Sequence, residues 1–88
     1  MSAVKYKIMP ESPNTDLEIV KSEVKRAIEE LGGIPNEAVE EPIAFGLKAI
    51  IISFAYPEEN EVDDVGNKIS EIGGVSSTEM IDYRRALG

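Results

Sequence analysis

Proline and glycine residues divide this 88-residue chain into six short segments whose hydrophobic periodicity changes from one segment to the next. Four segments alternate in polarity or run apolar as strands do, and two repeat apolar side chains at helical spacing. We expect strands at residues 4–9, 40–45, 47–56 and 76–84 and helices at residues 15–31 and 60–72. The chain is too short for a second domain, so residues 1–88 are expected to form one domain with the order β-α-β-β-α-β.

This order predicts an α+β fold of the ferredoxin-like type, a four-stranded antiparallel sheet with two helices on one face. Both crossover connections contain a helix, and right-handed crossovers place the two helices on the same side of the sheet. The other face of the sheet is then left uncovered. Pro42 suits an edge strand or a bulge, because proline cannot donate to the ladder of hydrogen bonds.

Residues 47–56 are apolar on both faces of the predicted strand, which is unusual for a sheet that is covered on one side. The first face carries Ile50, Ile52, Phe54 and Tyr56, and the second carries Leu47, Ala49, Ile51 and Ala55. Two interpretations stay open. The strand is central and shielded by the long side chains of its neighbours, or the uncovered face binds a partner.

Capping signals mark the ends of both predicted helices. Thr15 and Glu18 form a T-x-x-E capping box, in which each side chain accepts from the other residue's backbone N–H. Asn60 is the predicted N-cap of the second helix. Gly32 and the glycine pair at 73–74 are the predicted stops.

The chain contains no cysteine and no histidine. Their absence excludes disulfides, thiolate chemistry and histidine-activated nucleophiles, and it removes the commonest metal ligand. The adjacent carboxylates Glu40 and Glu41 could form an acid–base pair or hold Mg²⁺, but neighbours in a strand point to opposite faces. We therefore expect no catalytic residue, no metal site, no cofactor and no enzymatic activity.

Seventeen acidic and nine basic side chains give a formal net charge of −8, which repels nucleic acid and anionic membranes. Five of the cations lie on predicted strands or at the chain end: Lys5, Lys7, Lys48, Arg84 and Arg85. They indicate either a cationic zone that docks an anionic partner or scattered charges that only keep the protein in solution. No apolar run approaches the ~20 residues of a membrane span, and the first seven residues lack a signal-peptide core. We expect a cytoplasmic protein.

Residues 41–48 read E-P-I-A-F-G-L-K, which resembles the P-[IV]-[AG]-[FY]-G-[IL]-K signature of the translation elongation factor 1-beta family. The apolar strand that follows, and the ending at residues 75–79 and 83–88, are also similar to that family. The opening M-P-E-S-P at residues 9–13 resembles the short archaeal members. The resemblance covers essentially the whole chain.

The resemblance implies a guanine-nucleotide exchange factor that promotes GDP release from elongation factor 1-alpha, a GTPase that carries Mg²⁺, during polypeptide elongation. It implies that Phe45 contacts the GTPase and that Arg85, with Arg84 beside it, stands where eukaryotic members use a lysine to disturb the Mg²⁺ site. The partner-binding residues that it predicts are Pro42, Ile43, Phe45, Gly46, Lys48, Arg84 and Arg85. The long N-terminal region of eukaryotic members is absent, so we expect a minimal exchange domain that is monomeric alone.

Two other functions suit the same fold. The first is a small-molecule-binding regulatory domain, favoured by the apolar open face, although no glycine-rich ligand loop follows residues 4–9. The second is an RNA-binding module, which the negative charge and the absence of an RNA-recognition aromatic motif oppose.

Overall fold

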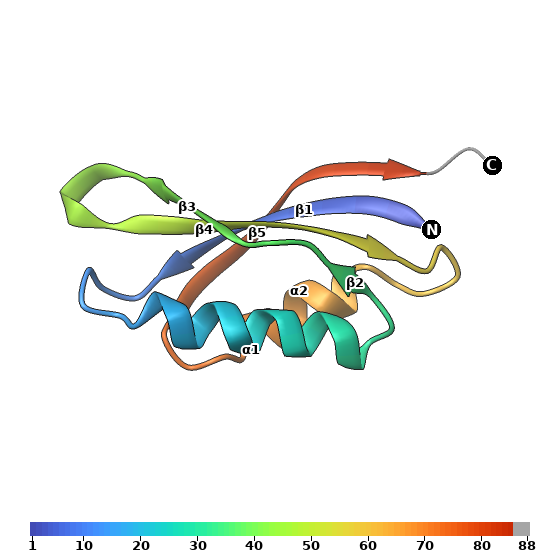
Figure 1. Ribbon diagram of the computed structural model, residues 1–88, viewed down its shortest axis with the longest axis horizontal. Coiled ribbons are helices and arrows are strands. Elements are labelled where there is room, and N and C mark those ends of the chain that lie inside the picture. Colours follow the sequence, from blue (N-terminus) through green and yellow to red (C-terminus); the bar gives the residue numbers. More distant parts are fainter. Residues whose placement is uncertain (86–88) are drawn as a thin grey trace.

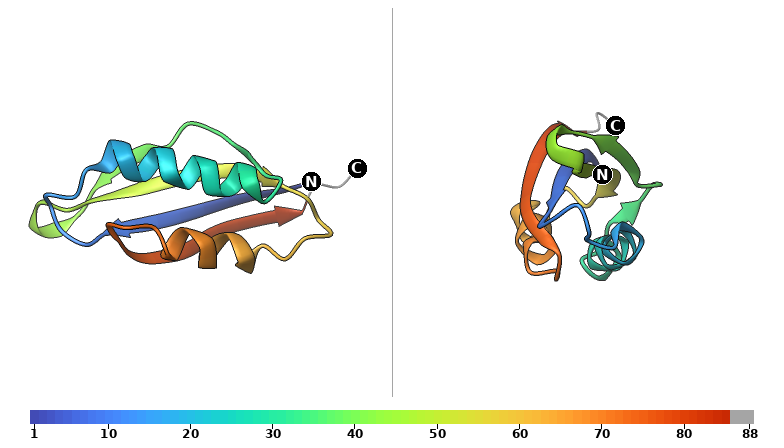
Figure 2. Two further views of the ribbon diagram at one scale, coloured as in Figure 1. Left: turned by 90° about the horizontal axis from the view of Figure 1, so that it is seen from below. Right: turned by 90° about the vertical axis from the view of Figure 1, so that its left-hand side faces the viewer.

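The computed structural model describes residues 1–85, which form one antiparallel sheet with two helices beneath it (Figure 1). The elements in chain order are β1 (Ser2–Pro10), α1 (Leu17–Glu30), β2 (Ile34–Pro35), β3 (Val39–Pro42), a turn at Ala44–Gly46, β4 (Lys48–Tyr56), α2 (Asp63–Ser70) and β5 (Val75–Arg85). Both helices cover the same face of the sheet, as right-handed crossovers require (Figure 2). The expected α+β class and the uncovered sheet face are confirmed.

The sheet has five strands rather than the predicted four. Its order is β2-β4-β1-β5, and β3 pairs with β4 on the same edge as β2. The strand predicted at 40–45 is β3, which ends at Pro42 because the turn begins at Ala44. β2 is an additional short strand on the same edge, separated from β3 by a break at residues 36–38. The backbone N–H of Asn36 donates to the carbonyl of Ser53 across this break, at 2.9 Å. The arrangement is compatible with a ferredoxin-like fold whose edge strand is interrupted.

The predicted N-caps of both helices are wrong. The side chain of Asp16 caps α1, because its Oδ1 accepts from the N–H groups of Glu18 at 3.1 Å and Ile19 at 3.3 Å. Thr15 instead accepts from the backbone of Ser12 and closes the preceding turn. The side chain of Asn60 does not cap α2 but donates to the carbonyl of Leu31 at 3.5 Å. A carboxylate one residue closer to the helix displaced the expected threonine cap.

The core lies between the sheet and the helices. It is built from alternate residues of β1 and β4, so that Ile50, Ile52, Phe54 and Tyr56 face the helices while Ile51 and Ala55 lie on the open face. Burying each large apolar side chain stabilises the fold by about 1.5–3 kcal/mol. The ring of Phe54 stacks on that of Tyr6, with centroids 5.7 Å apart.

The buried hydroxyl of Tyr6 is satisfied by the carbonyl of Val62, to which it donates at 3.1 Å. A Cβ at Gly66 would stand 3.2 Å from that hydroxyl oxygen. This close approach explains why α2 contains a glycine, although glycine weakens a helix by about 1 kcal/mol relative to alanine. The desolvation of Tyr6 raises its pKa above the ordinary tyrosine value.

The molecule is elongated, with principal extents of 42 × 21 × 18 Å. The turn between β3 and β4 lies at one end of the long axis, and the N-terminus and the end of β5 lie at the other (Figure 1). No helix among the described residues is long and apolar enough to span a membrane.

Candidate functional site

The turn between β3 and β4 holds a phenylalanine in a backbone conformation that phenylalanine rarely adopts. Phe45 has φ 61° and ψ 31°, and Gly46 has φ 74°. The N–H of Leu47 donates to the carbonyl of Ala44 at 3.2 Å, so the chain reverses over two left-handed residues. Such turns strongly prefer Asn-Gly, and a left-handed residue other than glycine costs roughly 1–2 kcal/mol. Nothing in the local backbone requires phenylalanine here.

The side chain of Phe45 is 93% exposed, so its ring does not contribute to the core. From sequence alone, a turn aromatic beside a glycine could cap the end of the core or anchor a partner. The exposed fraction rules out the cap. An exposed aromatic held at the tip of a hairpin is a typical anchor for another protein.

The hairpin that carries Phe45 extends beyond the rest of the sheet. The pairing of β1 with β4 runs from Ser2–Tyr56 to Ile8–Ile50. Beyond Ile50 the partner of β4, within the described chain, is β3. Residues 41–49 therefore form a two-stranded arm, and we call this segment the arm. It places Pro42, Ile43, Phe45, Gly46 and Lys48 together at one end of the molecule.

The two neighbouring carboxylates at the base of the arm do not converge, as expected. Glu40 pairs with Ile50, whose side chain faces the helices, whereas Glu41 pairs with Ala49. The Oε2 atom of Glu40 lies 2.7 Å from the Nζ of Lys21 on α1, and its Oε1 lies 3.9 Å from the Nζ of Lys48. No cluster of three or more potential metal ligands occurs among residues 1–85. This is an ion-pair network rather than an acid–base pair.

Arg84 and Arg85 lie at the opposite end of the molecule. Arg85 pairs with Ser2, which also pairs with Tyr56 at the far end of β4. Lys48 and Tyr56 are the two ends of a nine-residue strand, so the arm and the arginines are separated by about 27 Å. The seven predicted partner-binding residues thus form two groups, five on the arm and two at the end of β5.

The predicted cationic zone is not one continuous patch. Lys5 and Lys7 do lie on the open face, and β1 does adjoin both β4 and β5. However, Asp82 stands directly across from Lys5, and Glu79 stands across from Lys7. The open face therefore carries balanced charge along β1 and β5. Lys48 lies on the arm, far from both arginines.

The half of the open face nearer β2 and β3 is apolar. Ile34 pairs with Ala55 and Val39 pairs with Ile51, so all four side chains share this face. Ile34 and Val39 are 59% and 56% exposed. The apolar second face that the sequence predicted for residues 47–56 is present at Ile51 and Ala55, and helices do not cover it there, whereas Ala49 is fully buried.

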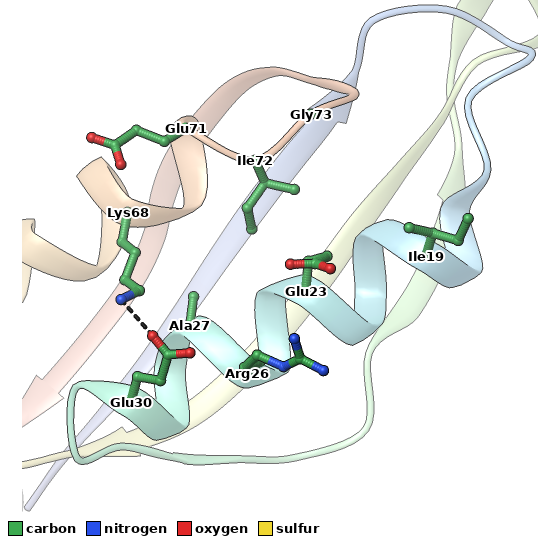
Figure 3. A pocket seen from close by; sticks show the side chains of 9 residues that line it. All are labelled: Ile19, Glu23, Arg26, Ala27, Glu30, Lys68, Glu71, Ile72 and Gly73. Carbon is green, nitrogen blue, oxygen red and sulfur yellow. Dashed lines mark ion pairs between the residues drawn. The ribbon is translucent and has the colours of Figure 1, made fainter.

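A hollow of about 600 Å³ lies between α1 and α2, on the side of the molecule away from the open face (Figure 3). Ala27 and Ile72 point into it, and the ion pair between Lys68 and Glu30, with Nζ and Oε2 2.6 Å apart, crosses one end. None of the predicted site residues lines this hollow. Sequence periodicity did not indicate it, because its walls mix apolar and charged residues contributed by two separate helices.

A strained, exposed aromatic side chain at one end of the molecule and two arginines at the other are features typical of surfaces that contact another macromolecule. Residues 3–85 match the sequence model of the EF-1 guanine nucleotide exchange domain family. The chain belongs to this family.

Named relatives extend over nearly the whole chain. It is 38% identical over 84 residues to elongation factor 1-beta of Methanosarcina barkeri, covering 94% of each protein. It is 40% identical over 82 residues to elongation factor 1-beta of Methanothermobacter thermautotrophicus, covering 92% of this chain and 91% of the relative. It is 41% identical over 81 residues to that of Nanoarchaeum equitans, covering 90% and 98%. The predicted resemblance to an archaeal exchange factor is confirmed.

Proposed function

We propose that this protein is a guanine-nucleotide exchange factor that promotes GDP release from elongation factor 1-alpha, as a single ferredoxin-like domain in the cytoplasm. Family membership supports the exchange activity. The observation that carries the docking site is Phe45, which is held exposed in a left-handed conformation at the tip of the arm. The protein acts as a docking factor, without catalytic groups or a cofactor of its own.

Exchange of a tightly bound nucleotide needs differential affinity rather than covalent chemistry. A factor accelerates release when it binds the emptied or distorted GTPase more tightly than the loaded one. Linkage then requires GDP to weaken binding of the factor by the same ratio. A rigid domain with an aromatic anchor and a distant cation can supply such a preference, and it needs neither histidine nor cysteine.

The separation of the two groups of residues constrains how docking occurs. Because about 27 Å separates the ends of β4, Phe45 and Arg85 contact different parts of the GTPase. In this proposal Phe45 anchors the arm, and the end of β5 brings a cation toward the ligands of Mg²⁺. Arg84 is held by Asp82, with Nε and Oδ2 3.3 Å apart. This leaves Arg85 as the better candidate for that cation.

The test is release of a fluorescent GDP analogue from elongation factor 1-alpha. We expect micromolar protein to accelerate release, and we expect Phe45→Ala and Arg85→Ala each to reduce the acceleration. No acceleration by the wild-type protein would overturn the function. Full activity in both variants would leave the function standing and overturn the assignment of the site.

The alternative, a small-molecule-binding regulatory domain, predicts a thermal shift with a metabolite and dimerisation through the open face. The exchange function predicts a monomer that elongation factor 1-alpha stabilises. Sedimentation of the protein alone and with nucleotide-free GTPase separates the two.

A further inference from the structure

The direction of the arm depends on what holds its base. Past Ile50 the arm consists of two strands, and an isolated two-stranded ribbon is only marginally stable in water. Its tip carries Phe45, so a small rotation at the base displaces the ring through a larger arc. A contact between the base of the arm and the helical layer would fix this angle.

Such a contact exists at Glu40, the residue that faces Ile50 at the base of the arm. Its carboxylate lies 2.7 Å from the ammonium of Lys21, which projects from α1. The side chains of Lys21 and Glu40 are only 18% and 29% exposed, so water screens this pair less than an ordinary surface ion pair. Glu18 approaches the same ammonium from α1 at 3.4 Å, and Lys48 lies 3.9 Å from Glu40.

A second lysine reinforces the same edge one helical turn later. The Nζ of Lys25 lies 3.4 Å from the Oε2 of Glu37, in the break between β2 and β3. The carboxylate of Glu37 is almost fully exposed, so this pair is the weaker of the two. The short distance and lower exposure make the Lys21–Glu40 pair the main ionic tie between α1 and this edge of the sheet.

The pKa values of Lys21 and Glu40 are shifted in the directions expected for a close ion pair. The hydrogen bond to Glu40 raises the pKa of Lys21, and the hydrogen bond from Lys21 lowers the pKa of Glu40. Both directions agree with the short distance between the two side chains.

We propose that Lys21 and Glu40 are positioning residues for nucleotide exchange: their ion pair fixes the angle of the arm and so presents Phe45 to the GTPase. This inference rests on the proposed function. It assigns neither residue a contact with the GTPase, because both act through the arm.

The proposal predicts a specific kinetic signature. When the pair is broken, only a fraction of the molecules hold the arm at the angle that binds the GTPase. The apparent affinity for the GTPase decreases in proportion to that fraction. The concentration that gives half-maximal acceleration should rise by up to about 5-fold, the upper limit for an ion pair of this kind. The maximal rate should stay unchanged, because the docked complex is the same.

The experiment is a charge-reversal cycle of Lys21→Glu, Glu40→Lys and the double variant, measured by GDP release against exchange-factor concentration. Each single variant should show the raised half-maximal concentration. The double variant restores an ion pair with exchanged ends and should recover part of the loss, because Glu18 and Lys48 then each lie beside a like charge. Thermal denaturation of every variant checks folding, and Glu40→Gln is a milder replacement if a reversal unfolds the protein.

The chain supplies a matched control in the ion pair between Lys68 and Glu30. It joins α2 to α1 with Nζ and Oε2 2.6 Å apart, and it lies away from the arm. The same reversal cycle on this pair should change the melting temperature comparably and leave exchange unchanged. A change that acted through general stability would appear in both cycles.

A second readout needs no GTPase. Because the chain has no cysteine, Ala44→Cys on the arm and Glu29→Cys on α1 can carry a spin-label pair without other replacements. The distance distribution should broaden in Lys21→Glu and narrow again in the double variant. If the wild-type protein fails to accelerate exchange, this readout still reports the geometry, and the proposed function alone is overturned.

Three results would overturn the positioning role. In the first, the single reversals leave exchange as unchanged as the control cycle does. In the second, the double variant keeps the full defect of Glu40→Lys, which would mean that Glu40 itself contacts the GTPase. In the third, the distance distribution is the same in the wild type and in Lys21→Glu.

Discussion

The two phenylalanines of the chain lie on the same β3–β4 hairpin in opposite surroundings. Phe54 is 2% exposed, stacks on Tyr6 and meets Tyr56 edge-on, whereas Phe45 is 93% exposed on a strained turn. One aromatic ring stabilises the fold. The other adds nothing visible to the fold and occupies a position where asparagine would be preferred. The comparison distinguishes side chains that stabilise the domain from side chains that the domain exposes for contact with a partner.

The largest expected effect is a loss of stability when the buried phenylalanine, Phe54, is replaced. Phe54→Ala removes a fully buried ring and should lower the free energy of unfolding by about 3–5 kcal/mol. A small domain has only about 5–15 kcal/mol in total, so this variant should be close to unfolding. Urea denaturation followed by circular dichroism measures the loss. A loss no larger than that of Phe45→Ala would contradict the assignment of Phe54 to the core.

The matching change at the tip should affect function alone. Phe45→Ala should leave the unfolding free energy nearly unchanged, because the ring is exposed. As an anchor worth about 2 kcal/mol, its loss should reduce exchange by roughly 30-fold. Titration of GDP release measures this effect. Ile19→Ala, on the exposed side of α1, is the control for removing an exposed apolar side chain.

Some features of the structure could be predicted from the sequence, and others could not. The order of elements followed from periodicity, because each main strand and helix is long enough to show one. Ile34–Pro35 could not be predicted, because a two-residue strand has no period. The exposure of Phe45 was also out of reach, since it lies where the strand pattern stops.

The separation of the arm from Arg84 and Arg85 follows from strand direction. β4 and β5 both run antiparallel to β1, so the start of one and the end of the other lie at opposite ends of the sheet. The contact between Lys21 and Glu40 had no sequence signal, because the helical spacing pairs Lys21 with Glu18 instead. That local pair exists, at 3.4 Å, but the shorter contact is the one to β3.

A third variant sharpens the contrast, because its effects on stability and function have opposite signs. Asparagine tolerates the left-handed conformation, so Phe45→Asn should raise the free energy of unfolding by about 1 kcal/mol. Exchange should fall as in Phe45→Ala. Chemical denaturation and GDP release on the same preparation measure both. A variant less stable than the wild type would show that the turn does not strain Phe45.

The smallest effect concerns pH and the base of the arm. The hydrogen bond from Lys21 lowers the pKa of Glu40 in the folded protein. Its contribution to stability is therefore complete above the ordinary glutamate pKa and is lost as the pH falls through the lowered folded value. The wild type should be more stable than Lys21→Met at neutral pH, and this difference should shrink at about pH 3. Thermal melts at both pH values measure it, and a difference that persists in acid would contradict this role of Glu40.

The proposed exchange function is tested most directly by the affinity of this protein for elongation factor 1-alpha with and without GDP. We predict tight binding to the nucleotide-free GTPase, and weaker binding as GDP is added, because GDP release and binding of the factor are linked. Isothermal titration or a pulldown with excess GDP measures this ratio. Equal affinity for the empty and the GDP-loaded GTPase would contradict the exchange function, since a partner that does not distinguish the two states cannot drive exchange.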